Sequence, residues 1–365
     1  MTGQLTMRSL KTDCRSFRGT VPCAPHKREG VHCTEADGSA CRRYDRLTER
    51  ILIIKLGAIG DVIRTTPLLR AYRRTRPGAQ IWWLTLTPDV VPPEADVVLP
   101  FTPQSAAILR ATRFDLLVNL DKDREACALA LTTEAGVKQG FTLRDGIPAP
   151  ADANAEHKFL TGLFDDVSRA NTKSYQEEIF EICGLPFAGE RYILDNHAAD
   201  GYTWKLPRKR TIVGLNTGCG GRWTSRLWAE KNWVALARGL KKKGYVTLLL
   251  GGEQEHARNR RIARASGALY PGTFPLPRFI NLVDQCACVV TAVTMAMHIA
   301  IGLGKKIVLF NNTFNPHEFE LYGLGEILAP DFACTCYYSP VCPNDCMQYL
   351  HVETVLASCT RLCAP

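Results

Sequence analysis

The chain has 365 residues, more than one hydrophobic core usually supports, so two domains with extensions are expected. Its apolar fraction of 46% and charged fraction of 22% exclude a largely disordered chain. The formal net charge of +9 favours anionic ligands such as nucleotide sugars or a lipid surface, which leaves peripheral membrane association open, whereas the lack of an aromatic and basic recognition motif argues against nucleic acid.

The N-terminal segment is rich in cysteine. It opens without an apolar stretch of signal-peptide length, so we expect a cytoplasmic protein. In that compartment cysteines are expected as thiols or metal ligands rather than disulfides. Four of them form a loose group, near His26 and His32, that could hold zinc or iron: Cys14, Cys23, Cys33 and Cys41.

Strands and helices alternate through the next part of the chain. Residues 51–56 form a continuous apolar run, typical of parallel strands that are buried on both faces. They pass through a glycine-rich turn into a helical pattern that begins near Asp61. The alternation predicts βαβ units and a parallel sheet. Helical stretches separate three further strand-like runs: residues 80–84, 97–99 and 116–120.

The same pattern starts again at residues 211–216, after a polar stretch at 197–210 that is the expected linker. A helix at 230–243, a strand at 245–250 and a helix that opens at Glu253 follow. We therefore predict four segments: a cysteine-rich extension (1–48), an N-terminal Rossmann-like domain (49–200), a C-terminal Rossmann-like domain (201–330) and a cysteine-rich tail (331–365).

The longest charge-free run, residues 286–304, approaches the length of a membrane span. Thr291, Thr294 and His298 interrupt it, and the run divides naturally into a short strand followed by a helix. We therefore predict a buried βα unit here.

Three strand-to-helix turns could bind an anion. In the first, Gly57 and Gly60 let the backbone approach a ligand, and the next helix offers free N–H groups. This turn is neither a dinucleotide fingerprint nor a P-loop. Asp61 could act in catalysis or only cap the helix.

In the second turn, glycines lie beside Arg222 and Arg226, which could bind a pyrophosphate through their guanidinium forks; a plain structural loop is the alternative.

In the third turn, Thr294 and Met295 open a helix whose first turn could present N–H groups to phosphate. His298, on the same apolar helix, could contact a ligand in the strand-to-helix crevice or lie satisfied in the core.

The tail carries four cysteines within a short span: Cys334, Cys336, Cys342 and Cys346. Thiolate clusters select zinc or iron, so a structural metal is expected, with ordinary packing thiols as the alternative because the spacing is not a standard pair of CxxC motifs.

The order and spacing of these motifs resemble glycosyltransferase family 9, the lipopolysaccharide heptosyltransferase family. The resemblance covers roughly residues 50–349, and the matching pieces are ILIIKLGAIGDVIRTTPLLRA, GLNTGCGGRW, TMAMHIA and ELYG. It implies an α/β protein of the GT-B fold, with two Rossmann-like doubly wound domains facing a cleft. It also implies that the N-terminal domain binds the acceptor, that the C-terminal domain binds ADP-heptose, and that transfer inverts the anomeric carbon with no cofactor required for catalysis.

By motif match, Asp61 takes the position of the family's general base, which accepts the proton of the acceptor hydroxyl. Glu253 would contact the ribose, and most of the other matched residues would contact the phosphates. The positions expected to bind the donor are Gly60, Thr217, Gly218, Arg222, Arg226, Glu253, Thr294, Met295 and His298.

Two positions depart from the family pattern. Val293 stands where an Asp is usual and cannot hydrogen-bond a sugar hydroxyl, so the donor sugar stays open. Arg226 stands where Lys is common, which keeps the charge but changes the geometry. The alternatives to a transferase are a sugar-nucleotide epimerase of GT-B fold and a non-catalytic sugar-nucleotide-binding or scaffold protein. The acceptor could be lipopolysaccharide core, another glycan, a protein or a metabolite.

Overall fold

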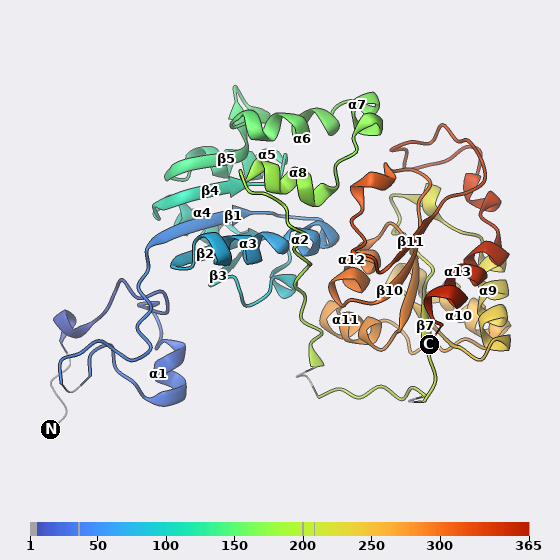
Figure 1. The fold of residues 1–365 in the computed structure, drawn as a ribbon, viewed down its shortest axis with the longest axis horizontal. Coiled ribbons are helices and arrows are strands. Elements are labelled where there is room, and N and C mark those ends of the chain that lie inside the picture. Colours follow the sequence, from blue (N-terminus) through green and yellow to red (C-terminus); the bar gives the residue numbers. More distant parts are fainter. Residues whose placement is uncertain (1–5, 36, 199–200, 208, 365) are drawn as a thin grey trace. The chain divides into compact units, whose positions relative to one another are not determined.

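The chain folds into two compact units. The computed structural model describes residues 6–35, 37–198, 201–207 and 209–364 (Figure 1). Unit 1 comprises Met1–Leu56 and Leu68–Ala155, and unit 2 comprises Gly57–Pro67 and Glu156–Pro365. The short segment that contains Asp61 therefore belongs to unit 2, although the strand before it belongs to unit 1.

Unit 1 is built on a six-stranded sheet with the order β3-β2-β1-β4-β5-β6. The first five strands are parallel, and β6 runs antiparallel to β5. In β1 the residues Ile51 to Ile54 are fully buried, and Ile51 is in register with Ile81 and Leu116. The strands are β1 (Glu49–Ile54), β2 (Ala79–Thr85), β3 (Val97–Pro100), β4 (Phe114–Asn119), β5 (Ala135–Arg144) and β6 (Ile147–Pro150).

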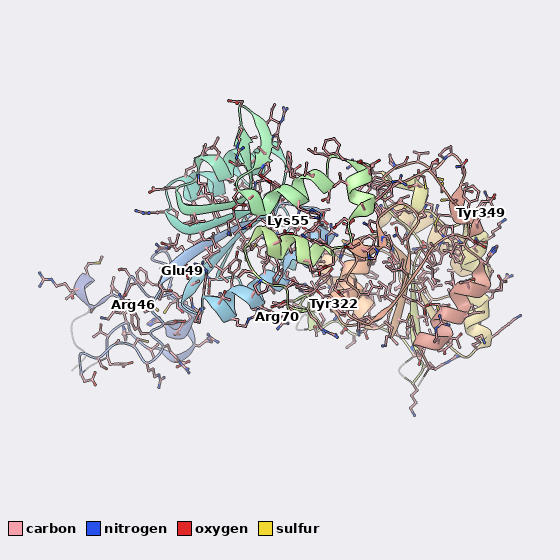
Figure 2. The ribbon with its side chains drawn as sticks, turned by 45° about the horizontal axis from the view of Figure 1, so that its top comes forward. Arg46, Glu49, Lys55, Arg70, Tyr322 and Tyr349 are labelled. Atoms are coloured by element: carbon pink, nitrogen blue, oxygen red, sulfur yellow. The ribbon has the colours of Figure 1, made fainter. Side chains whose placement is uncertain are left out.

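Helices cover the sheet of unit 1 and bury its apolar residues. Leu52 and Leu117 from the central strands pack in one cluster with Leu109 of α4 and Leu129 of α5. Lys55, labelled in Figure 2, directly follows β1; it is buried and forms an ion pair with Asp121. These helices are α3 (Pro67–Thr75), α4 (Pro103–Arg110) and α5 (Arg124–Thr132), while the short α1 (Ala24–Glu29) lies in the N-terminal extension.

Unit 2 carries a five-stranded parallel sheet with the order β11-β10-β9-β7-β8. The strand order reverses between β7 and β9, and ligands of doubly wound sheets bind at such a switch point, beyond the carboxyl ends of the strands. The strands are β7 (Ile212–Asn216), β8 (Val246–Leu250), β9 (Cys288–Ala292), β10 (Lys306–Phe310) and β11 (Gly325–Leu328).

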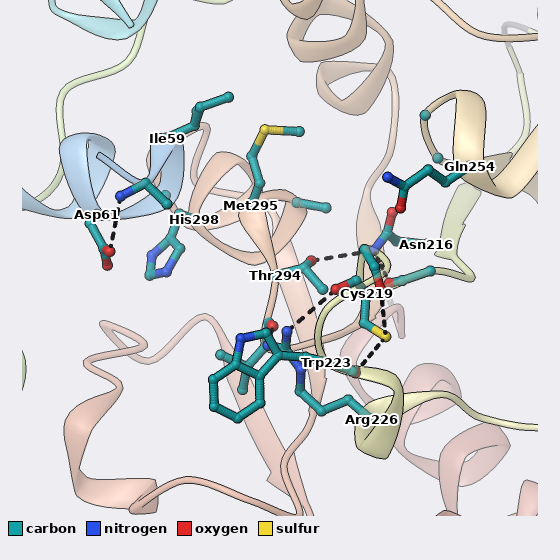
Figure 3. Close-up of a pocket in the computed structure, with 18 of the residues that line it drawn as sticks. Ile59, Asp61, Asn216, Cys219, Trp223, Arg226, Gln254, Thr294, Met295 and His298 are labelled. Atoms are coloured by element: carbon teal, nitrogen blue, oxygen red, sulfur yellow. Dashed lines mark hydrogen bonds between the residues drawn. The ribbon is translucent and has the colours of Figure 1, made fainter. Parts of the chain in front are cut away.

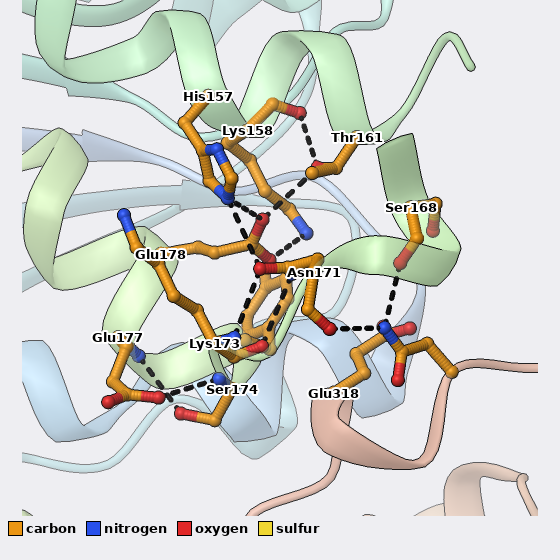
Figure 4. Close-up of polar contacts among 12 residues, drawn as sticks. His157, Lys158, Thr161, Ser168, Asn171, Lys173, Ser174, Glu177, Glu178 and Glu318 are labelled. Carbon is orange, nitrogen blue, oxygen red and sulfur yellow. Dashed lines mark hydrogen bonds and ion pairs between the residues drawn. The ribbon is translucent and has the colours of Figure 1, made fainter. Parts of the chain in front are cut away.

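The core of unit 2 contains Trp228, Trp233 and Phe310, which lie edge-on or tilted toward one another. A buried carboxylate, Glu178 of α8, is paired with Lys158 of α6 at 2.6 Å (Figure 4). The helices are α2 (Ile59–Thr65), α6 (Glu156–Thr161), α7 (Asp165–Ala170), α8 (Tyr175–Ile182), α9 (Glu230–Lys242), α10 (His256–Ser266), α11 (Leu276–Asp284), α12 (Met295–Gly302) and α13 (Val352–Leu362).

The two parallel-rich sheets confirm the predicted α/β doubly wound class. The predicted βα unit at 286–304 is formed by β9 and α12. Of the predicted linker, residues 201–207 lie outside any helix or strand, while 199, 200 and 208 fall outside the described residues. The predicted segment bounds stay a prediction. Within the described part of the chain, no helix has both the length and the hydrophobicity needed to cross a membrane.

Candidate functional site

Unit 2 contains a cavity of about 770 Å³ at the switch point of its sheet (Figure 3). Its walls come from the start of α2, the loop after β7, the loop after β8, the turn between β9 and α12, and the loop that follows β10. This volume lies within the usual range of small-molecule sites.

Hydrogen bonds tie the loop after β7 to the start of α12. Asn216, the last residue of β7, donates from Nδ2 to Oγ1 of Thr291 at 3.0 Å and to Oγ1 of Thr294 at 3.3 Å. Gly218 follows; a Cβ atom on it would lie 2.0 Å from Oε1 of Glu255, so a side chain there would displace Glu255. Gly218 and Glu255 both line the cavity, and the missing side chain at Gly218 leaves room for Glu255 there.

Arg226 is a buried guanidinium, only 8% exposed, on the cavity wall. It donates to the carbonyl oxygens of Val293 and Cys219, while its Nε has no partner among the described residues. Burial lowers the pKa of Arg226 to about 10, partly offset by Cys219, so the side chain is charged at neutral pH. Among the described residues no carboxylate pairs with it, which leaves a buried positive charge open to an anion.

Asp61 is the third residue of α2, and its Oδ2 accepts the N–H of Ala58 at 3.3 Å. Ala58, not Asp61, is the N-cap residue, so the N-cap interpretation of Asp61 is wrong in detail. One turn along, Arg64 pairs with Asp61 at 2.8 Å and with Glu318 at 2.8 Å. The Arg64 guanidinium lies 3.4 Å above the ring of Tyr175.

Arg64 keeps its charge in this buried position. Burial lowers its pKa, but the charges of Asp61 and Glu318 outweigh that effect and hold the pKa well above its ordinary value. Two carboxylates thus already neutralise Arg64, in contrast to Arg226.

His298 lies on α12 against the start of α2. A Cβ atom on Gly60 would be 2.4 Å from Cδ2 of His298, so the glycine permits this close approach of the two helices. Burial lowers the pKa of His298 to about 3. The charge of Arg64 also lowers this pKa, and the charge of Asp61 partly offsets the effect. The ring is therefore neutral at neutral pH. Its Nδ1 has no partner among the described residues.

Eight of the predicted catalytic and donor-binding residues line the cavity: Gly60, Asp61, Gly218, Arg226, Glu253, Thr294, Met295 and His298. Thr217 and Arg222 do not line it. The Thr217 hydroxyl donates to Oδ1 of Asn259 at 2.6 Å, and Arg222 is exposed beside the ring of Trp223. The roles of all ten residues stay predictions.

Several other residues that line the cavity were not predicted from the sequence: Arg64, Trp223, Phe314, Glu318 and Tyr338. Arg64 had a usable signal, because residues three apart on a helix face one another and Asp61 is its partner at that spacing. The other four lie outside regular helices and strands or in a single short turn, where no periodic pattern marks a side chain as facing a cavity.

The four tail cysteines come together as predicted, with ligand atoms all within 4.8 Å of one another. The Sγ atoms of Cys334 and Cys342 are 3.4 Å apart, and those of Cys336 and Cys346 are 3.7 Å apart. A tetrahedral zinc site with Zn–S bonds of about 2.3 Å needs S···S separations of about 3.8 Å, so these residues fit a single ion.

Hydrogen bonds connect this tail cluster to the loop that carries Arg226. Nδ2 of Asn312 donates to Sγ of Cys346 at 3.2 Å and to the carbonyl oxygen of Ser225 at 2.8 Å. The Ser225 N–H and hydroxyl donate to the carbonyl oxygens of Pro340 and Ser339 at 3.0 and 2.8 Å. The cysteine-rich tail therefore braces one wall of the cavity.

Solved structures of similar fold include ADP-heptose lipopolysaccharide heptosyltransferase II of E. coli, at 17% identity over 86% of this chain and 98% of that one, with a TM-score of 0.63. A family 9 glycosyltransferase from Veillonella parvula matches at 17% identity over 87% and 97%, with a TM-score of 0.65. The iron-containing dodecameric glycosyltransferase TibC of enterotoxigenic E. coli matches at 13% identity over 86% and 78%, with a TM-score of 0.53. These likenesses show a shared fold of the GT-B type.

A search of curated protein sequences found no match to the chain. The model of glycosyltransferase family 9 (heptosyltransferase) matches residues 105–325, more than half of the chain. The chain therefore belongs to glycosyltransferase family 9, the heptosyltransferase family, and is a glycosyltransferase.

Proposed function

We propose that this enzyme transfers a heptose or a related sugar from an ADP-linked donor to a hydroxyl group of a glycan, protein or metabolite acceptor, with inversion at the anomeric carbon. One observation carries the proposal: the unneutralised buried Arg226 and the carboxylate of Asp61 line the same cavity. A diphosphate would supply the missing negative charge, and Asp61 would accept the proton of the hydroxyl group that attacks the attached sugar.

The donor diphosphate is proposed to lie between Arg226 and the start of α12. Thr294 is the N-cap of this helix but makes no side-chain capping hydrogen bond. The Met297 N–H donates to the carbonyl oxygen of Thr294 at 3.1 Å, which leaves the N–H groups of Met295 and Ala296 for an anion. The positive end of the helix dipole and the guanidinium both favour the developing charge of the leaving group. Structures of the E. coli heptosyltransferase WaaC with ADP and with an ADP-linked fluoro-heptose support adenine in the donor.

In the proposed step the acceptor hydroxyl oxygen attacks the anomeric carbon, and Asp61 takes the hydroxyl proton. The bond between the anomeric carbon and the diphosphate oxygen breaks, and its electron pair leaves with ADP. Arg64 pairs with the Asp61 carboxylate at 2.8 Å and so orients it on the cavity wall. His298, neutral at neutral pH, adds no competing charge.

The nucleotide preference can be tested by calorimetry with ADP and UDP on the purified protein. We expect ADP to bind measurably more tightly, and a nucleotide at a hundred times its dissociation constant to stabilise the fold by about 2.7 kcal/mol. Tight UDP binding without ADP binding would contradict the proposed donor. Turnover is then followed with ADP-linked sugars, because Val293 leaves the sugar open. Binding without turnover of any donor would favour the non-catalytic alternative.

We also propose that the tail cysteines hold one structural zinc ion, with iron as the second candidate. The sulfur separations support a tetrahedral site, and TibC, of similar fold, is described as iron-containing. When bound, the ion would cross-link the tail. The four cysteines that bind it take no part in the proposed transfer step.

For Cys342→Ser we expect loss of the ion and a lower melting temperature. A metal that contributes about 2.7 kcal/mol corresponds to a drop of roughly 5 to 11 °C for a unit of this size. Elemental analysis and thermal unfolding provide the measurements, and Cys183→Ser, at a buried cysteine outside both clusters, is the control. Unchanged melting after complete removal of metal would contradict a structural role.

A further inference from the structure

The described part of the N-terminal extension forms regular structure but has no hydrophobic core. Of residues 6–35 and 37–48, none has a buried side chain. The segment nevertheless forms α1, with a left-handed cap at Gly30, and isolated antiparallel bridges at Cys14–Arg46 and Thr34–Ala40. Segments of this size that cannot build a hydrophobic core usually depend on a cross-link, either disulfides or a metal.

All four cysteines of the extension line one small cavity of about 20 Å³, together with His32. A cavity must offer roughly 10 to 15 Å³ to admit a single water-sized sphere, so this one has room for a single ion and not for an organic ligand. The cysteines that line it are Cys14, Cys23, Cys33 and Cys41.

The backbone holds these cysteines in place. The Cys41 N–H donates to the carbonyl oxygen of Cys33 at 3.0 Å, which fixes the two across a hairpin. Cys23 is the N-cap residue of α1. The Arg43 N–H donates to Sγ of Cys41 at 3.3 Å, the kind of hydrogen bond that supports a thiolate in a metal site.

A histidine is also prepared for coordination. Nδ1 of His26 donates to the carbonyl oxygen of Val31 at 2.9 Å, so its Nε2 carries the free lone pair. This is the usual arrangement of metal-binding histidines, whose second nitrogen is fixed by a carbonyl or carboxylate. The His26 ring centroid is 5.3 Å from that of His32, which itself lines the cavity.

We propose that the extension binds a single zinc or iron ion through its cysteines, with His26 or His32 able to replace one of them, and that this ion takes the place of a hydrophobic core. Among the described residues only the tail cysteines form a group within 4.8 Å, so binding would turn the N-terminal sulfurs inward. The site is separate from the tail cluster, since it lies in unit 1, and it does not depend on the proposed sugar transfer.

Removal of the tail site isolates the new one. In full-length protein with Cys334→Ser and Cys346→Ser, purified without oxidation, we expect about one equivalent of zinc or iron to remain. Adding Cys33→Ser and Cys41→Ser should remove it, whereas Ser16→Ala, in the same cavity but without a thiol, should not. Less than about a tenth of an equivalent in the tail variant would overturn the proposal.

Cobalt titration provides a second measurement that needs no substitution in the extension. It uses the variant with Cys334→Ser and Cys346→Ser after a chelator has removed its metal. We expect one equivalent of Co²⁺ to bind with sulfur-to-cobalt charge-transfer absorption, and its absence counts against the site. Mass spectrometry of the native thiols completes the test. If the four cysteines are joined in disulfides, the extension is cross-linked covalently and the metal proposal fails.

Discussion

Asp61→Asn is expected to lower turnover by about a hundredfold or more, the usual contribution of a positioned general base. Asparagine has nearly the same shape and can still accept the Ala58 N–H at the start of α2. Arg64 retains Glu318 as a charged partner. Fold and ADP affinity should therefore change little, and the loss should appear in kcat.

Steady-state kinetics and ADP calorimetry on the same preparations separate these effects. Asp166→Asn, on the exposed surface of α7, is the matched control and should leave turnover unchanged. If Asp61→Asn retains most of its activity, Asp61 serves only the local structure of α2 and another group accepts the proton.

Arg226→Ala is expected to weaken ADP binding by about 1.5 to 3 kcal/mol, the range for a hydrogen bond to a charged group, or about ten- to hundredfold in Kd. The variant removes the one buried cation of the cavity that has no carboxylate partner among the described residues. Arg226→Lys should bind with intermediate affinity, because it keeps the charge but cannot reach both the Val293 and Cys219 carbonyls as a fork does.

Calorimetry measures both variants, with Arg260→Ala, on the exposed face of α10, as the control. Equal loss in the control would point to general charge rather than to a site. An unchanged Kd in Arg226→Ala would move the diphosphate elsewhere and withdraw the main support for the proposed donor site.

The sequence predicted the buried framework because buried parallel strands leave a continuous apolar signal. Residues 51–56 became β1 with its adjoining residues, and 286–304 became β9 and α12. Much of the cavity was also predictable. Arg226 and His298 follow β7 and β9, and the carboxyl ends of these parallel strands meet at one edge of the sheet in unit 2. Asp61 follows β1 of the other sheet, so its place in this cavity was predicted by the motif match and not by this rule. The gathering of the tail cysteines followed from their short spacing.

Other features depend on contacts that no local pattern encodes. Arg64 pairs with Glu318, 254 residues further along the chain, and only the folded unit brings them together. Thr217 was predicted to bind phosphate like its neighbours, but its hydroxyl donates a hydrogen bond to Asn259. The absence of buried side chains from the described part of the extension was equally hidden, because composition alone does not reveal which apolar residues find partners.

The assignment of α2 to unit 2 has a consequence for how the enzyme sets its reaction geometry. The proposed base and the proposed phosphate site belong to one compact body, joined where Gly60 meets His298. The van der Waals contact of α2 with α12 would then set the spacing between the proposed proton acceptor and the proposed leaving group. The relative position of the two groups would then be set within unit 2 before an acceptor binds.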